Sequence, residues 1–594
     1  MVRKILGFLF VISAVVCILF ALTFDFLRGR PFSYGLIQLG LTIFGFFIGA
    51  VGVLILSKIQ LLDLLPQFST GTELNHFRLH FEKLYSPGGR WVLWGMCIFL
   101  STVYLLIWTT SSPLYPLNYW VDSNSFFTMG KGMVHGMIPY RDLFEQKGPL
   151  LYFLHAIGYL ISNTSFLGIF FFEVVFFAVF LFYSHMIISI FIDRKVALIA
   201  LPIISSGILS LESFSLGDSA EEFFLPMLMI SLYHLILYFK HIYPKPMPDL
   251  WVLINGILAG CVLWIKFSCL GFWFGWIVSL IICMLTNKQY FHMVRISLIF
   301  LLGMFVVTIP WVVYFGINNS IGDWLNTYFG FNLTVYPNTI SFFGILKNMI
   351  QSIQQQVLVN PVFSLLLMAG LMVFIVTKKF IQNLWQRLCL FLCIFFLALG
   401  VYASGFGFPY YFLIFTPFIV FAVITLFSLF PKVHRRLSTF SPVLAILITI
   451  LITGATITIS LTSHTNQKLS WLGVNKEDLV QYKFAAIINQ TEGATLLNYG
   501  SLDGGFYTVS GIVPNVKYFH KNNVSRREYP IVEDEQDRYI REKKVDFVVI
   551  RLSPGISVEQ MVVSELFQNY HMVSVEQQEF VDTQFSYYLF EKIP

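Results

Sequence analysis

WVDSNSFFTMGKGMVHGMIPYRDLFEQKGPLLYFLH, residues 120–155, is a polar island in a very apolar chain. Glycines and aromatic residues surround its charges, and long hydrophobic segments lie on both sides of it. An ionisable group close to a membrane core is costly and is usually retained for pairing or for function. The island gathers the ionisable residues Asp122, Lys131, His135, Arg141, Asp142, Glu145 and Lys147 within about one loop.

The composition excludes an ordinary soluble enzyme. Hydrophobic residues make up 57% of the 594 residues and charged residues only 12%, and the mean hydropathy is +0.73. Many apolar runs are long enough to cross a bilayer core of about 30 Å as helices. The net charge of +6 is small, and the basic residues mostly stand between apolar segments. This pattern favours membrane topology over nucleic-acid binding, so we predict a multi-pass protein of the cytoplasmic membrane with no nucleic-acid partner.

The cysteines and histidines give no sign of a metal site. All seven cysteines lie inside apolar segments and no Cys-x-x-Cys pair occurs, which supports neither a zinc site nor a disulfide framework. His135, His155 and His185 do not share metal-ligand spacing. We therefore expect no cofactor and no metal site made by protein ligands alone, with a divalent metal left open.

The basic residues between the apolar segments predict the topology. When these residues are placed in the cytoplasm, the chain has thirteen crossings, a cytoplasmic N-terminus and an extracellular C-terminus. Residues 113–165 then form the first outer loop. Its apolar part, 149–162, has about fourteen residues, too few to span the membrane. We predict that it is a short helix that lies in or dips into the outer membrane face.

Three regions follow from this reading. Residues 1–90 form a transmembrane hairpin and a cytoplasmic linker, residues 91–462 form the main transmembrane region, and residues 463–594 are polar and mixed. In the last region LVQYKFAAIINQ is typical of a helix and VDFVVIR of a buried strand. We predict a small extracytoplasmic α/β domain there, of about 130 residues, which is a normal domain size.

Two residues of the first outer loop are suited to chemistry on a phosphate-linked substrate. Asp122 lies near the membrane interface, where a carboxylate can act as general base on an acceptor hydroxyl. Lys147 begins the short apolar helix, where a cation can hold a lipid phosphate as leaving group. The alternative is that the charges of this loop simply pair with one another: Asp122, Arg141, Asp142, Glu145 and Lys147.

Further polar groups stand at the ends of other apolar segments. In ESFSLGDSAEEFF, Glu221 and Glu222 begin a helix, so they either face a substrate or only complement the helix dipole. Lys266 stands at a turn between two apolar segments and either contacts a substrate or snorkels to the interface. In SGFGFPYYFLIFTP, the paired tyrosines 410 and 411 are suited to bind a phosphate or a sugar, although interfacial tyrosines are common.

These motifs resemble those of GT-C glycosyltransferases, in the bacterial branch related to protein O-mannosyltransferases and lipid A aminoarabinose transferases. Asp122 matches the family's early acidic residue, and Asp218 or Glu221/Glu222 its second outer acidic position. Two departures occur: Ser123 replaces a second acidic residue, which argues against a motif-bound metal, and Pro409 replaces a histidine. The further matches are Pro139, Tyr140, Asp142, Lys147, Gly148, Pro149, Leu150, Lys266 and the segment Gly405 to Pro417.

The resemblance implies a GT-C-like catalytic domain in residues 91–462. Such enzymes transfer a sugar, with inversion, from a polyprenyl-phosphate carrier to an acceptor outside the cytoplasmic membrane. The partners implied are the lipid-linked donor, the bilayer, and a cell-envelope glycan, lipid or protein as acceptor. Asp122 would be the base, Lys147 with Arg141 would hold the phosphate, and Asp218 or Glu221 would be the second carboxylate. The remaining expected substrate contacts are Asp142, Glu145, Glu222, Lys266, Tyr410 and Tyr411.

Three other classes compete with this reading. A transporter or flippase of lipid-linked glycans also has many helices and buried charges, but it needs no long polar outer loop, and inverted hydrophobic halves are not evident. A polymerase or ligase of surface glycans shares the lipid-linked donor but carries its main loop elsewhere. A non-enzymatic envelope-assembly protein would use residues 463–594 as a binding module.

Overall fold

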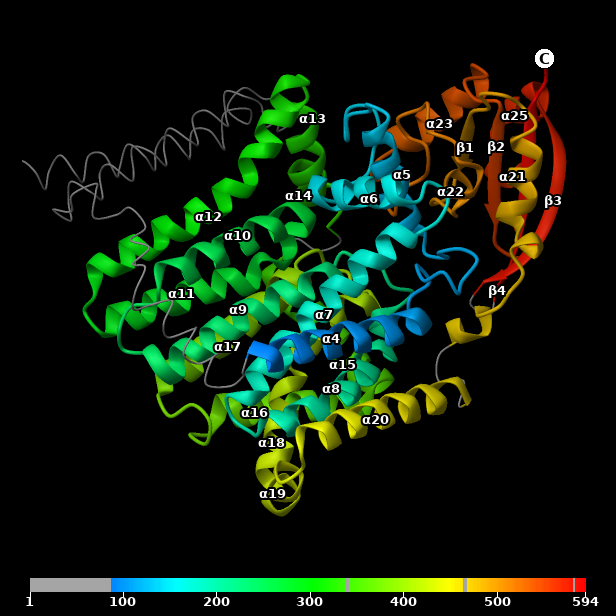
Figure 1. Ribbon diagram of the computed structural model, residues 1–594. Helices are drawn as coiled ribbons and strands as arrows, with labels where there is room; N and C mark the ends of the chain where they lie inside the picture. The colour runs from blue at the N-terminus through cyan, green and yellow to red at the C-terminus, as the bar shows by residue number, and fades with distance from the viewer. Residues whose placement is uncertain (1–86, 338–340, 463–466, 581–582) are drawn as a thin grey trace, which may run out of the picture.

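The computed structural model describes residues 87–337, 341–462, 467–580 and 583–594. Of the hairpin and linker expected in residues 1–90, all but the last four residues lie outside the described ranges. The long helices lie side by side and form the body of the molecule, and the strands gather beyond one end of it (Figure 1). Eight helical stretches in the described residues are long and apolar enough to cross a membrane. They are Gly89–Trp108, Leu167–Ser189, Glu222–Ile242, Asp249–Thr286, Tyr290–Ile317, Leu384–Val401, Pro409–Leu429 and Pro442–Thr462.

One of these stretches folds back on itself. Helix α10 (Asp249–Lys266) and helix α11 (Gly271–Thr286) are separated by a short 3-10 turn, Phe267–Leu270. The amide of Asn287, after α11, donates to the Tyr243 hydroxyl, before α10, at 3.3 Å. The two helices are therefore antiparallel and count as two passes, as the sequence predicted. The total of thirteen crossings, two of them in residues 1–86, stays a prediction.

The other helices complete the transmembrane body. Arg194–Leu209 (α8) and Pro361–Val376 (α16) are each only 16 residues long. The side chains of α7 (Leu167–Ser189) and α9 (Leu225–Leu237) are mostly buried. The further helices are α4 (Pro87–Trp108), α12 (Tyr290–Ile317), α15 (Phe342–Val359), α17 (Leu384–Val401), α18 (Ile419–Leu429) and α20 (Pro442–Thr462).

The polar island folds into two short helices joined by a loop. Helix α5 (Val121–Val134) carries the first charges, and helix α6 (Pro149–Ile161) follows the loop. At 13 residues α6 is too short to span a membrane, so the predicted short helix is present. The two helices pack closely, because a Cβ on Gly130 would lie 2.5 Å from the backbone nitrogen of Ala156.

The strands expected near the C-terminus are present. They form one sheet in the order β1-β2-β4-β3, with β1 parallel to β2 and the other pairs antiparallel. The segment VDFVVIR supplies β2, whose side chains are almost all buried. The bounds are β1 (Leu496–Tyr499), β2 (Phe547–Leu552), β3 (Tyr570–Phe580), β4 (Thr583–Lys592), and the helices α21 (Val480–Ile488), α22 (Phe506–Ser510) and α23 (Ile531–Arg541).

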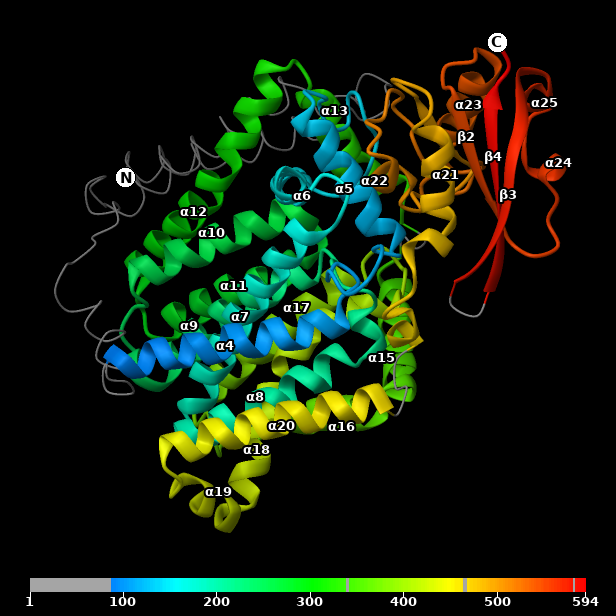
Figure 2. The same ribbon diagram turned by 45° about the vertical axis from the view of Figure 1, so that its right-hand side comes forward.

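This C-terminal region sits on α5. Both ribbon views place α22 beside α5, with β3 and β4 on the far side (Figures 1 and 2). The fully buried Lys131 ammonium donates to the carbonyls of Tyr507, at 2.6 Å, and Ile512, at 3.1 Å. The Thr128 hydroxyl donates to the Asp503 carboxylate at 2.6 Å. Lys131 thus fastens the C-terminal region to the polar island.

Candidate active site

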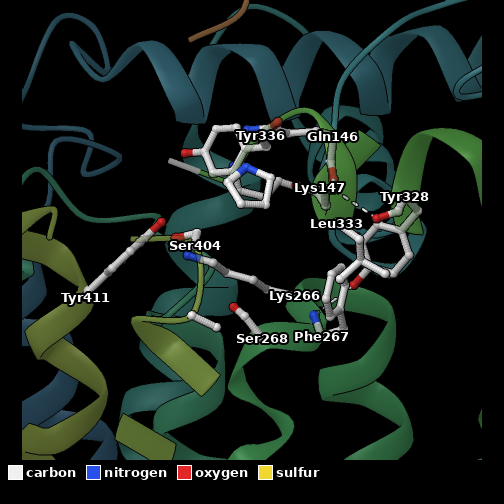
Figure 3. Close-up of a pocket in the computed structure, with 13 residues that line it drawn as sticks. Gln146, Lys147, Lys266, Phe267, Ser268, Tyr328, Leu333, Tyr336, Ser404 and Tyr411 are labelled. Atoms are coloured by element: carbon white, nitrogen blue, oxygen red, sulfur yellow. Dashed lines mark hydrogen bonds between the residues drawn. The ribbon is translucent and has the colours of Figure 1, made fainter. Parts of the chain in front are cut away.

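Two lysines distant in sequence line one pocket. Lys147 is brought to the end of α10 because the Gly148 N–H donates to the Ile265 carbonyl at 2.9 Å. Lys147 and Lys266 line this pocket together with Tyr336, Ser404 and Tyr411. Figure 3 shows the Lys266 ammonium, the Tyr411 hydroxyl and the Ser404 side chain directed toward the same space. We call this site the lysine pocket.

Lys266 contacts several of the residues that the sequence predicted to be at the site. Its ammonium forms an ion pair with Glu221, a carboxylate that is almost completely buried. The same ammonium lies 4.0 Å from the ring centroid of Tyr411 and 5.6 Å from that of Tyr410. Cations are attracted to aromatic faces at such distances. The structure therefore brings together Glu221, Lys266, Tyr410 and Tyr411, four of the residues that the sequence motifs singled out.

The Lys147 ammonium has no ion-pair partner within the described ranges. The ammonium lies 5.6 Å from the centroid of the Phe126 ring. The Glu145 carboxylate, two residues earlier, is occupied by the Tyr152 hydroxyl and by the Lys147 N–H, the latter at 2.7 Å. Burial lowers the pKa of Lys147, but the Glu145 and Asp122 carboxylates outweigh it and hold the pKa above its ordinary value. The ammonium is thus charged and available to an anion.

Asp122 lies in the first turn of α5. It does not line the lysine pocket, but it interacts electrostatically with both pocket lysines. Its half-buried carboxylate has neither a hydrogen bond nor an ion pair in the part of the chain that the structure describes. Burial raises the pKa of Asp122, an effect opposed by Lys147 and Lys266 and supported by Glu145 and Glu221. The charges of Asp122, Glu145, Lys147, Glu221 and Lys266 therefore influence the protonation of Asp122 together. A carboxylate with a raised pKa is suited to accept a proton.

Asp218 and Glu222, also expected at the site, lie elsewhere. Asp218 is fully buried, and its carboxylate lies 3.0 Å from Nε2 of His155. Its backbone N–H donates to carboxylate oxygens of Glu173 and Glu222, each at 2.9 Å. The three acidic residues form a buried carboxylate cluster against α6 and α7, and neither Asp218 nor Glu222 lines the lysine pocket. The feature of the sequence that could have indicated this cluster is Glu173, a single glutamate inside an apolar helix.

Arg141 and Asp142 pair with each other, as the alternative reading of the loop allowed. The two side chains form an ion pair at 2.8 Å, and Arg141 is 42% exposed. Arg141 also donates to the Asn318 carbonyl at 3.0 Å, and the Asp142 carboxylate accepts from the Ile138 N–H at 2.8 Å. The pair fixes the loop before α6 and does not line the lysine pocket.

Sequence motifs did not single out every residue of the pocket. Tyr328, Asn332 and Tyr336 come from a π-helical stretch, Asn326–Phe331, and the chain that follows it. Tyr328 donates to the Leu263 carbonyl at 2.5 Å and so holds this stretch against α10. The Gln146 side-chain oxygen is buried without a hydrogen bond in the described ranges. The weak signal in sequence was a run of polar residues between two apolar segments.

Protein side chains alone do not form a metal site in the described residues, where no group of three or more His, Cys, Asp or Glu residues is placed to hold an ion. Glu145 and Glu221 are already occupied by Tyr152 and Lys266. The Asp122 carboxylate, which is near enough to Lys147 and Lys266 to interact with their charges, has no such partner among the described residues. The expectation from the sequence, no cofactor and no metal site made by protein ligands alone with a divalent metal left open, stays a prediction.

Gly148 is needed for the position of Lys147. A Cβ at residue 148 would lie 2.0 Å from the Trp264 carbonyl oxygen, a backbone atom that cannot move aside alone. We expect Gly148→Ala to destabilise the protein by about 1–3 kcal/mol, the usual cost of overpacking, and to displace Lys147. Thermal unfolding in detergent measures the loss. Gly95→Ala in α4 is the control, because no heavy atom lies within 4 Å of its added Cβ; equal melting temperatures for the two variants would contradict the prediction.

Comparison with known proteins identifies the fold. No family model and no curated protein matches the sequence. A crystal structure of ArnT from Cupriavidus metallidurans bound to undecaprenyl phosphate matches with a TM-score of 0.53 and 11% identity, over 83% of this chain and 98% of that one. The apo structure matches with a TM-score of 0.53 and 12% identity, over 85% and 98% of the two chains. The chain is therefore a multi-pass membrane protein with the fold of ArnT, as the resemblance to lipid A aminoarabinose transferases implied.

Proposed function

We propose that the protein is a glycosyltransferase that moves a sugar from a polyprenyl-phosphate donor to an acceptor hydroxyl, with inversion. One observation carries the proposal. Asp122 and Lys147, a carboxylate and an ammonium that both lack partners among the described residues, share one half-buried site. Unpaired charges in such a place are costly, and a substrate with a phosphate and a hydroxyl would satisfy both. The fold supports the proposal, because the matching ArnT structure binds undecaprenyl phosphate.

The lysine pocket is the donor side of this site. Transfer breaks the bond between the sugar C1 and a phosphate oxygen, so the leaving polyprenyl phosphate gains one negative charge. The Lys147 ammonium is free to stabilise that charge, and Lys266 adds a second cation nearby. The hydroxyl of Tyr411 faces the same space (Figure 3) and is able to donate a hydrogen bond to a phosphate oxygen.

Asp122 serves the acceptor side. Its carboxylate takes the proton of the acceptor hydroxyl while the acceptor oxygen attacks C1 on the face opposite the phosphate. One displacement of this kind inverts the configuration at C1. Of the expected second carboxylates, Glu221 is the one at the pocket, where it holds the Lys266 ammonium. Asp218 instead positions His155 behind the site.

The proposed orientation places the site on the outer face of the cytoplasmic membrane, with the N-terminus inside and the C-terminal region outside. The basic residues between apolar segments support this orientation. The acceptor is then a cell-envelope glycan, lipid or protein.

Deletion of the gene tests the proposed activity. We expect the mutant to lose one sugar from its envelope and to accumulate the corresponding lipid-linked donor. A lipid extract of the mutant then serves as donor and envelopes of the mutant serve as acceptor for the purified protein, and chromatography follows the release of polyprenyl phosphate. A transporter or flippase would move the lipid-linked sugar but leave the sugar–phosphate bond intact, so absence of release with an intact donor would refute glycosyl transfer.

A further inference from the structure

His520, in the C-terminal region, is a buried polar group without a partner. Its side chain is only 5% exposed. Neither ring nitrogen makes a hydrogen bond of normal geometry to any residue that the structure describes. Leaving a buried donor or acceptor unsatisfied is unfavourable. A histidine in this state can be satisfied by a hydrogen-bonding ligand that binds to the protein.

The segment that carries His520 runs along the polar island. The Phe144 N–H donates to the Lys517 carbonyl at 2.9 Å, and the rings of Phe144 and Tyr518 lie 5.2 Å apart. On its other side, the Phe519 carbonyl accepts from the Asn498 N–H at 3.1 Å. Asn498 donates to Asp503, the residue bound by Thr128 of α5. His520 is thereby held between the loop that ends at Lys147 and the helix that begins beside Asp122.

The charges that act on His520 are consistent with this position. Burial lowers the pKa of His520, while the carboxylates of Asp503, Glu145 and Asp122 and the backbone of Lys521 act in the opposite direction. Burial prevails, so the ring is neutral at pH 7 and offers one N–H donor and one nitrogen acceptor. A neutral ring with both functions suits a hydroxyl group, which also donates and accepts. The Asn522 side-chain nitrogen is likewise buried without a hydrogen bond in the described ranges.

We propose that His520 holds the acceptor, by hydrogen bonds to hydroxyl groups of a sugar or other polyol that is presented to Asp122. This inference rests on the proposed glycosyl transfer and adds that the C-terminal region selects the acceptor. The donor side is made elsewhere, because every residue lining the lysine pocket falls between Gln146 and Tyr411. A base must contact the acceptor hydroxyl. His520 lies between the loop that ends at Lys147 and helix α5, outside the donor pocket, and is therefore placed to contact an acceptor that is presented to Asp122.

Two substitutions separate acceptor binding from a structural role. His520→Leu removes both hydrogen-bonding functions, whereas His520→Gln keeps a donor and an acceptor. The matched control is His571→Leu on β3, where the side chain is 53% exposed. All three variants are made in the full-length protein. Each is compared with the wild type for melting temperature, binding of undecaprenyl phosphate, and transfer to envelopes of the deletion mutant from its extracted donor.

We expect His520→Leu to raise the apparent KM for acceptor envelopes by roughly tenfold, the effect of losing one or two hydrogen bonds. Binding of undecaprenyl phosphate and the melting temperature should stay at the wild-type level, and His520→Gln should recover most of the transfer. Wild-type transfer by His520→Leu would overturn the inference, and so would a parallel loss of lipid binding or of folding. If the wild-type protein itself releases no polyprenyl phosphate, glycosyl transfer fails and this inference fails with it.

Discussion

Replacement of Asp122 by asparagine is expected to lower the rate of sugar transfer by about 10²- to 10⁴-fold, the contribution of a positioned general base. Asparagine has nearly the same shape, but it does not accept the proton of an acceptor hydroxyl. No hydrogen bond or ion pair to a described residue is lost by the change, so expression, membrane insertion and thermal stability should be unchanged. Release of polyprenyl phosphate from the lipid-linked donor, measured per milligram of purified protein, gives the rate.

The protonation of the Asp122 carboxylate is expected to determine how the rate of transfer depends on pH. Burial raises the pKa of Asp122, and only the ionised form accepts a proton. The rate should therefore fall as the pH falls through this pKa, and it should fall at a higher pH than an ordinary aspartate would dictate. If the residual rate of the Asp122→Asn variant keeps the same acid limb as the wild type, another group is responsible for it.

Asp142→Asn is the matched control in the same loop. Asp142 pairs with the exposed Arg141 and does not line the lysine pocket. An exposed ion pair contributes only about 0–1 kcal/mol, so this variant should transfer sugar at close to the wild-type rate. Full activity of Asp122→Asn would exclude Asp122 as the base and leave Glu221 as the carboxylate to test, because it pairs with the pocket residue Lys266.

Local sequence signals predicted the parts of this site well. The apolar run after Lys147 is too short to span a membrane and forms the short helix α6. Lys266 interrupts an apolar stretch and indeed stands at the turn between α10 and α11. Glycine and proline before Tyr410 break the helix and bring the tyrosine pair to Lys266. Each of these features depends on residues adjacent in the chain, so the pattern of the sequence contains it.

Contacts between segments that are distant in the chain could not be predicted from the sequence. Glu221 and Asp218 are three residues apart, yet one faces Lys266 and the other His155. The backbone decides between them, because Asp218 has a positive φ of 59° in a tight turn that directs it inward. The C-terminal region, with His520, lies against α5 because Lys131 and Thr128 bond to it. Neither the turn nor the docking has a sequence motif that would reveal it.

The polar island therefore combines two kinds of charge. Lys131, Arg141, Asp142 and Glu145 are satisfied by partners within the protein and hold the loop and the C-terminal region in place. Asp122 and Lys147 are not satisfied within the described residues. The paired charges hold the surrounding chain rigid, and this rigidity prevents Asp122 and Lys147 from moving together to form an ion pair.

Replacement of Lys147 by methionine should weaken binding of undecaprenyl phosphate by about 10- to 100-fold, because a hydrogen bond to a charged group contributes about 1.5–3 kcal/mol. Methionine keeps the length of the side chain and its contact with Phe126, and it removes only the charge. Titration of the purified protein with undecaprenyl phosphate measures the affinity. Lys483→Met serves as control, since Lys483 pairs with Glu576 at 2.7 Å in the C-terminal region and is 41% exposed.

Lys266 gives the comparison that separates phosphate binding from folding. Lys266→Met leaves the Glu221 carboxylate, only 1% exposed, without its ion-pair partner. Breaking a buried pair in this way typically destabilises a protein by about 3–5 kcal/mol, so this variant should lose thermal stability. Adding Glu221→Gln should restore much of the stability, because the unpaired charge is then gone. Lys147→Met should instead lose lipid binding at an unchanged melting temperature, since its ammonium has no ion pair in the described structure. If Lys147→Met still binds the lipid but the Lys266→Met/Glu221→Gln double variant does not, then Lys266, and not Lys147, binds the phosphate.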